Sequence, residues 1–291
     1  MTNFHPTPQR ETLAFPIPEV TYQFQKKMAG LIFLLYLTVL IILLYVISGC
    51  SASPPHRLPT HYQSEPQGSQ ILQGKLSGHT QGRLPVGLAI VVHGETSHGP
   101  TALHEDNWPQ FAARVKQTVQ DIMPVTMQEV IRLENIPAGE KGPLVQGLGG
   151  NPPIAVVLVV LSSSQEARGP AQFDVLPEVS MLHGYQTENH ATVELGLVDL
   201  SSGKLLLQSQ GTSYAVLDQL DVPLASNRYP RVRGSAMTSP TYPENGKALE
   251  TLRIVALYEA LDQAAMKLAQ KWPEGARGST PSTPTRASVD S

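Results

Sequence analysis

Cysteine is nearly absent from this chain of 291 residues, which contains a single one, Cys50. One cysteine excludes an intramolecular disulfide and any metal or iron–sulfur site that needs several thiolates. Charged residues are also scarce: they make up 15% of the chain, and the formal net charge is only −3. This balance argues against a broad basic surface, so we expect no nucleic-acid partner. Glycine and proline, in contrast, are abundant, with 23 and 25 residues.

A long uncharged run stands near the N-terminus. Residues 28–46 are almost all apolar, and no charged residue occurs from there until Arg57. About 20 apolar residues are needed to cross the hydrocarbon core of a bilayer. A soluble helix would also carry a polar stripe, which this run lacks. Because Lys26 and Lys27 precede the run, the pattern predicts a cytoplasmic N-terminus and export of the remaining chain.

The single cysteine follows this run directly. Ile47, Ser48, Gly49 and Cys50 place an aliphatic residue and two small residues before the thiol. This pattern resembles the lipobox of bacterial lipoprotein signal peptides. The resemblance implies cleavage between Gly49 and Cys50 and acylation of Cys50. Several acyl chains together hold a protein stably on a membrane, which one chain alone does not.

Two features leave an alternative open. The segment before the run is 27 residues long, and the run itself exceeds the usual 7–15 residues of a cleaved signal. An uncleaved single-pass anchor is therefore the second interpretation. Both interpretations place the rest of the chain in the periplasm. Ser51 follows the cysteine, and by resemblance to enterobacterial lipoproteins a residue other than Asp there favours the outer membrane.

Composition divides the chain into four parts. We expect a signal peptide or membrane segment at 1–49, a flexible tether at 50–83, a globular domain at 84–272 and a disordered tail at 273–291. The tether is rich in Ser, Pro, Gly, Gln and His and has no apolar period. The tail has almost nothing to bury.

The domain alternates strand and helix patterns. Spacings of four, four and three between Phe111, Val115, Val119 and Ile122 predict a helix with one apolar face. The expected elements are strands at 86–93, 125–136, 154–161 and 179–184, a hairpin at 191–200 and 204–213, and helices at 108–123 and 247–271. Loops are expected at 162–177 and 216–245. This order predicts an α/β fold: a mixed β-sheet with two main helices packed on it, preceded by an N-terminal membrane-targeting helix.

The hairpin carries a second resemblance. Its sequence VELGLVDLSSGKLL, followed by an Ala-rich terminal helix, is similar to envelope lipoproteins of the curli-secretion-channel and penicillin-binding-protein-activator type. Those proteins have Thr-Gly-Glu at the turn where this chain has Ser-Ser-Gly-Lys. The resemblance implies a non-catalytic protein that oligomerises or docks on a partner. It assigns no functional residue in this chain.

One segment offers enzyme chemistry. His93, His98 and His104 stand with three carboxylates between residues 93 and 106, and such residues can bind a divalent metal. The alternative function is therefore a membrane-anchored envelope hydrolase or metal-binding protein that uses the His93–Asp106 loop. A polar, solvent-facing loop fits the segment better, because its ligands do not sit on rigid elements with fixed spacing. We therefore expect no enzyme activity, no metal and no cofactor.

The candidate partner contact lies in the long segment 216–245. Tyr229, Arg231 and Arg233 bring together residue types that are enriched where proteins bind one another. The sequence thus predicts a lipid-anchored envelope lipoprotein with a binding or assembly role. Its expected partners are the membrane, through acylated Cys50, and either an envelope protein or a second copy of the chain.

Overall fold

A computed structural model of the chain describes residues 36–38, 56–79, 82–92, 107–134, 136, 144, 154–173, 182–221, 228–236, 239–244 and 246–273. The chain divides into two compact units, Met1–Pro55 and His56–Ser291. In the first unit, the described residues 36–38 are helical and lie inside the apolar run. Over the described residues, no helix has both the length and the apolar character needed to cross a membrane.

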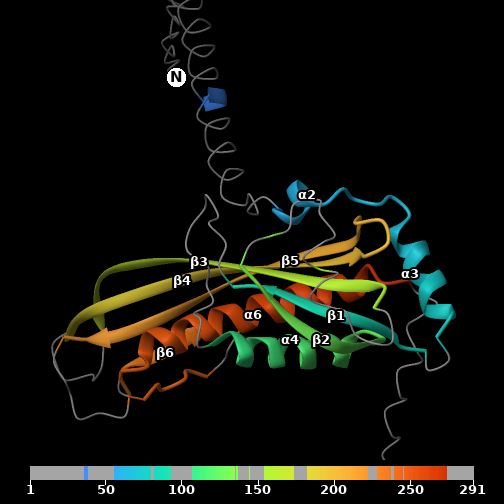
Figure 1. The fold of residues 1–291 in the computed structure, drawn as a ribbon. Coiled ribbons are helices and arrows are strands. Elements are labelled where there is room, and N and C mark those ends of the chain that lie inside the picture. Colours follow the sequence, from blue (N-terminus) through green and yellow to red (C-terminus); the bar gives the residue numbers. More distant parts are fainter. Residues whose placement is uncertain are drawn as a thin grey trace, which may run out of the picture. The chain divides into compact units, whose positions relative to one another are not determined.

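The second unit is built on one six-stranded sheet (Figure 1). Its strand order is β2–β1–β3–β4–β5–β6. The bounds are β1 Leu84–Val91, β2 Val125–Leu133, β3 Val156–Phe173, β4 Leu182–Asp199, β5 Leu205–Leu220 and β6 Arg231–Gly234. β1 pairs in parallel with β2 and β3, and every pair from β3 to β6 is antiparallel. The predicted mixed sheet is therefore confirmed.

Two helices, α4 (Trp108–Ile122) and α6 (Ala248–Gln270), pack on one face of this sheet (Figure 1). Alanines bring α6 very close to β5. A Cβ atom built on Gly211 would lie only 1.9 Å from the carbonyl oxygen of Ala260, so only glycine fits there. The predicted α/β class with two main helices is thus confirmed.

The predicted tether at 50–83 is wrong for residues 56–79. This segment forms α2 (Leu58–His61) and α3 (Gly68–Ser77). Leu58 and Tyr62 are buried in a second apolar cluster, on the face of the sheet opposite α4 and α6. Leu72 and Leu76, four residues apart and so on one side of α3, join the main core. A segment with few apolar residues therefore folds because nearly all of them are buried.

Two predicted loops contain strands. β3 continues to Phe173 through the predicted loop at 162–177, and its register with β4 is unbroken from Val156–Asp199 to Phe173–Leu182. The predicted irregular segment 216–245 contains the end of β5 and all of β6. Residues 165–168 of β3 are exposed on both sides of the strand, and the charged Asp218 interrupts the apolar residues at the end of β5. Neither segment therefore shows the apolar pattern that predicts a strand.

Candidate functional site

Several predicted site residues lie outside the described part of the chain. These are Gly49 and Cys50 of the lipobox and the weak metal candidates His93, His98 and His104. Within the described residues, no group of three or more His, Cys, Asp and Glu side chains is placed to hold a metal ion. The described polar clusters lie elsewhere, on the sheet and at its hairpin turn.

Glu194, in β4, fixes the start of the folded domain. Its carboxylate accepts hydrogen bonds from the backbone N–H of Arg57 (2.8 Å) and of Leu58 (3.1 Å), and Arg57 Nε lies 3.4 Å away. The side chain is only 1% exposed, and a buried charge is costly unless it is hydrogen-bonded. Leu58 fits here because Gly196 has no side chain: a Cβ on Gly196 would lie 2.7 Å from Leu58 Cδ1.

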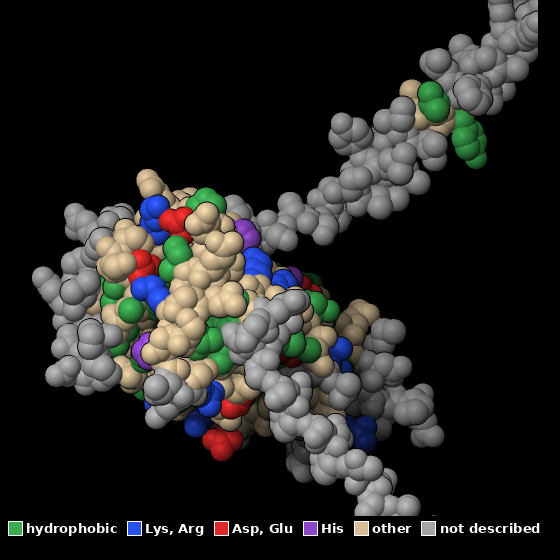
Figure 2. Space-filling model, turned by 90° about the vertical axis from the view of Figure 1, so that its right-hand side faces the viewer, with side chains coloured by type: hydrophobic (Ala, Val, Ile, Leu, Met, Phe, Trp, Pro, Cys, Tyr) green, Lys and Arg blue, Asp and Glu red, His purple; other side chains and the backbone are tan. Residues whose placement is uncertain are grey.

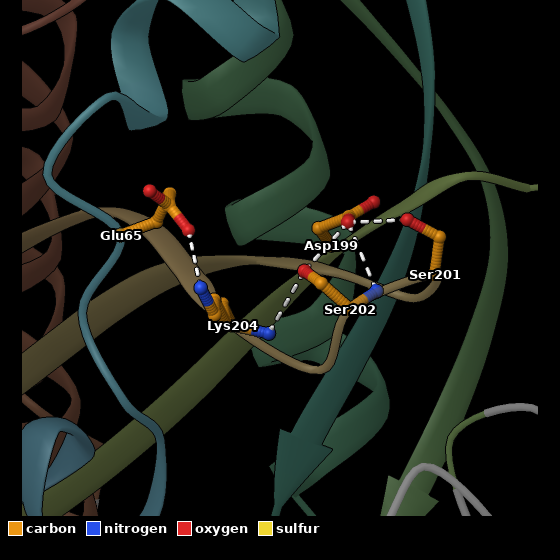
Figure 3. A network of polar contacts seen from close by, with 5 residues as sticks. All are labelled: Glu65, Asp199, Ser201, Ser202 and Lys204. Carbon is orange, nitrogen blue, oxygen red and sulfur yellow. Dashed lines mark hydrogen bonds and ion pairs between the residues drawn. The ribbon is translucent and has the colours of Figure 1, made fainter.

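The segment after α2 also runs along the first residue of β5. Leu205 donates its N–H to the carbonyl of Gln63, and Glu65 donates its N–H to the carbonyl of Leu205, each at 2.9 Å. Lys204 Nζ lies 2.7 Å from a Glu65 carboxylate oxygen (Figure 3). The hydrogen bond from Lys204 lowers the pKa of Glu65. These contacts place residues 63–65 beside the β4–β5 turn.

The turn itself is organised by Asp199, as Figure 3 shows. One carboxylate oxygen of Asp199 accepts hydrogen bonds from Ser201 Oγ, Ser202 Oγ and the Ser202 N–H, at 2.5, 2.7 and 3.0 Å. The other oxygen lies 3.1 Å from Lys75 Nζ in α3. Burial raises the pKa of Asp199, but the hydrogen bonds from these serines and Lys75 together hold it well below its ordinary range. Gly203, at φ +73°, completes the tight turn.

This end of the domain, with α3 and the turn, is mixed in charge. Figure 2 shows Lys and Arg side chains next to Asp and Glu, with apolar side chains between them. Its acidic and basic groups are used in internal contacts such as Glu65–Lys204 and Asp199–Lys75. The contacts described at this end therefore stabilise the fold.

The predicted partner-contact residues meet at the opposite end of β5. Arg231 Nε lies 2.8 Å from Asp218 Oδ2, and a terminal nitrogen of Arg233 lies 3.1 Å from the same oxygen. Gln186 of β4 donates to the second oxygen of Asp218 at 3.3 Å. The Asp218 side chain is fully buried, whereas those of Arg231 and Arg233 are 32% and 47% exposed. The strand register sets this arrangement, since β5 places Asp218 opposite Arg231.

Aromatic rings flank the two arginines. The Tyr229 ring lies 4.9 Å from the Arg231 guanidinium and 5.5 Å from the Phe173 ring. On the same side of the sheet, the rings of the cross-strand pair His190 and Tyr214 are tilted to each other, with their centroids 5.8 Å apart. Tyr214 is 48% exposed. We call the set Gln186, Asp218, Tyr229, Arg231 and Arg233 the arginine cluster.

Sequence reasoning found the arginines and Tyr229 but missed the residues that position them. Asp218 and Gln186 come from β5 and β4, at 13 and 45 positions before Arg231. One signal was present: Asp218 follows three apolar residues in a strand pattern, where a charge needs a partner. Nothing in the sequence indicated which basic residue that partner is.

An open hollow of about 470 Å³ lies at the end of β3 and β4, near the arginine cluster along the strands. Its lining includes His183, Tyr185 and Asp221. The Arg168 guanidinium lies 4.3 Å from the Tyr185 ring at this place. The lining thus combines hydrogen-bonding groups with an aromatic ring that Arg168 already contacts.

Comparisons with known proteins give distant likenesses only. No protein-family model matches the chain, and no curated protein matches its sequence. Among solved structures, the chain is similar to a putative neuraminyllactose-binding hemagglutinin homolog from Helicobacter pylori, with TM-score 0.33, 8% identity and coverage of 68% of this chain and 87% of that one. It is also similar to lipoprotein GNA1162 from Neisseria meningitidis, with TM-score 0.24, 14% identity and coverage of 45% of this chain and 83% of that one. A third similar structure is hypothetical protein CT253 from Chlamydia trachomatis, with TM-score 0.26, 10% identity and coverage of 64% of this chain and 92% of that one. At TM-scores below 0.5, these likenesses assign no function to the chain.

Proposed function

We propose that this protein is a lipoprotein of the bacterial cell envelope, anchored by acyl chains on Cys50. In this proposal its α/β domain lies in the periplasm and binds another envelope component or a second copy without catalysing a reaction. The proposed location is the outer membrane, because Ser51 rather than Asp follows the cysteine. The arginine cluster is the proposed contact surface.

The position of Cys50 is the observation that carries the proposal. The only thiol of the chain stands after Ile47, Ser48 and Gly49, and these follow an uncharged apolar run. A short aliphatic and small-residue sequence lets the chain enter a peptidase, and the thiol accepts the lipid. An apolar run followed by this sequence, with the cysteine at its end, is the pattern that acylation and cleavage require.

A non-catalytic role is supported by how two serines beside the carboxylate of Glu259 are used. Ser213 Oγ and Ser235 Oγ each lie 2.7 Å from Glu259 Oε2, and the Ala236 N–H donates to the same oxygen at 3.1 Å. Burial raises the pKa of Glu259, but these hydrogen bonds lower it below its ordinary value. A carboxylate with a lowered pKa is a poor general base. The group instead holds the end of β6 against α6.

Acyl labelling tests the anchor. Cells that express the full chain are fed a labelled fatty acid, and the wild type is compared with Cys50→Ser and with Ser51→Ala as a matched control. We expect label on the wild type and the control and none on Cys50→Ser. The labelled protein should lack residues 1–49, and it should fractionate with the outer membrane. Equal labelling of Cys50→Ser would refute acylation at this residue, and an unlabelled full-length product would favour the uncleaved anchor.

Metal analysis separates this proposal from the hydrolase alternative. The purified protein is compared with a His98→Ala, His104→Ala double variant. We expect no stoichiometric metal in either sample. A bound metal that is lost in the double variant would overturn the non-catalytic assignment and favour the alternative that uses the His93–Asp106 loop.

A further inference from the structure

We infer that Arg231 and Arg233 form a binding site for a carboxylate on an acidic polypeptide segment. The inference rests on the proposed binding role and names the chemistry of the partner. The juxtaposition that carries it is a fully buried carboxylate, Asp218, beneath two half-exposed guanidinium groups beside the Tyr229 ring.

The arginines keep most of their hydrogen-bond donors. A guanidinium has five N–H groups. Among the contacts of the described residues, Arg231 uses Nε on Asp218, and Arg233 uses one terminal nitrogen. The two side chains are 32% and 47% exposed, so part of each guanidinium-bearing side chain is within reach of a ligand. The remaining N–H groups can bind a second carboxylate through paired hydrogen bonds.

Charge and rigidity favour the same ligand. Two guanidinium groups face one carboxylate in the cluster, which leaves one positive charge uncompensated there. Asp218 is held in turn by Gln186, so the arginines are tied to the sheet from below. A flexible arginine loses side-chain entropy when it binds, and ordering it beforehand reduces that loss.

The surroundings favour a polypeptide over a lipid headgroup. Anionic lipids are recognised by clusters of four to eight Lys or Arg residues, and this cluster has two arginines with an internal carboxylate. Tyr229 stacks beside Arg231, and Tyr214 is exposed on the same side of the sheet. Tyr and Arg dominate the binding energy of protein interfaces. The partner we propose is therefore a protein segment rich in Asp and Glu.

Binding of a defined peptide tests the inference. The full acylated chain in detergent micelles is titrated into a fluorescent glutamate-rich peptide, with the same peptide carrying glutamines as the reference ligand. The test variant is Arg233→Gln. Arg231 and Gln186 still contact Asp218 in this variant, so the domain stays folded, which a thermal unfolding curve verifies. The matched control is Arg253→Gln in α6, where Arg253 pairs with Glu166 and is 38% exposed.

We expect the acidic peptide to bind the wild type and the glutamine peptide to bind at least tenfold more weakly. Arg233→Gln should lower the affinity for the acidic peptide about tenfold, and Arg253→Gln should leave it unchanged. Arg233→Lys keeps the charge but loses the planar fork of donors, so it should fall between the wild type and Arg233→Gln.

Three results would overturn the inference. One is equal binding of the acidic peptide by the wild type and Arg233→Gln. Another is equal weakening by Arg253→Gln, which would show a general charge effect. The third is Arg233-dependent binding of inorganic phosphate or phosphatidylglycerol vesicles with no binding of the peptide. Acyl labelling of Cys50 is measured separately, so failure of the peptide site and failure of the proposed anchor are distinguished.

Discussion

Glu194 and Asp218 lie on the same face of the sheet, and each is almost fully buried. Glu194 stands opposite Gln210, eight residues before Asp218 in β5, a separation of about 27 Å at ~3.4 Å per residue. Glu194 is bonded to backbone N–H groups of a segment that covers it. Asp218 is bonded to arginine side chains that are themselves partly exposed, at 32% and 47%.

In our proposal, one sheet face serves two purposes. Around Glu194 two of the three hydrogen bonds come from backbone N–H groups and the third from the Arg57 side chain, so the contacts determine where the folded domain begins. Around Asp218 the partners are arginines with unused donors, so the contacts position groups that can bind something else. Removing a partner should therefore change stability at both carboxylates and recognition only at Asp218.

The largest effect is expected from the double variant Arg231→Gln, Arg233→Gln. It leaves Asp218 buried without a cation, and breaking a buried ion pair in this way typically costs 3–5 kcal/mol of folding free energy. Urea unfolding measures the loss. Adding Asp218→Asn to the double variant should restore most of it, and no restoration would show that the arginines stabilise the fold in another way.

A somewhat smaller effect is expected from Leu58→Ala in α2. The change opens a cavity against Gly196 and Leu205, and such truncations cost about 2–5 kcal/mol. The exposed Gln63 provides the control variant, Gln63→Ala, which should lie within about 0.5 kcal/mol of the wild type. An unchanged free energy of unfolding in Leu58→Ala would mean that α2 does not contribute to the folded domain.

At the β4–β5 turn we expect a pH effect. The pKa of Asp199 is lowered on folding, so its carboxylate stabilises the domain above its ordinary pKa of 3.8, and this stabilisation is lost as the pH falls further. At pH 7, Asp199→Asn should cost about 1.5–3 kcal/mol, the usual net value of hydrogen bonds to a charged group. The difference in free energy of unfolding between the variant and the wild type should become smaller below about pH 4. A difference that is constant with pH would show that the charge of Asp199 is not involved.

The smallest effect is expected from Tyr62→Phe. Burial raises the pKa of Tyr62 to about 12, and its hydroxyl has no hydrogen-bond partner among the described residues. Removing an unpaired buried hydroxyl should leave stability unchanged or raise it by up to about 1 kcal/mol. A loss of more than about 1 kcal/mol in the free energy of unfolding would show that the Tyr62 hydroxyl has a hydrogen-bond partner in the folded domain.

The sequence predicts the elements that bury one apolar face. The helices at 108–123 and 247–271 and the hairpin turn at Asp199 are confirmed within a few residues, because periodic apolar residues and a turn glycine determine them locally. The predicted strand at 86–93 corresponds to β1, and that at 154–161 to the buried first part of β3.

The elements that the sequence analysis did not predict depend on residues far away in the chain. Residues 162–173 extend β3 because β4 offers them a continuous register, although their side chains are mostly polar. Residues 56–65 are ordered by Glu194 and Leu205, which lie more than 130 positions away. The arginine cluster shows both cases: its arginines are visible in sequence as an interaction motif, whereas Asp218 is recognisable as their counter-ion only through the pairing of β5 with β6.

The early start of the folded chain limits how far this protein can reach. Arg57, held by Glu194, is the seventh residue after Cys50, and seven residues span at most about 25 Å even when fully extended. β3 alone, with 18 residues, is about 60 Å long at ~3.3 Å per residue. In the proposed lipoprotein, the linker from the acylated Cys50 to Arg57 is shorter than the domain that it anchors. Linker and domain together reach at most about 85 Å from the lipid surface, so the partners of the proposed lipoprotein must come to the membrane to meet it.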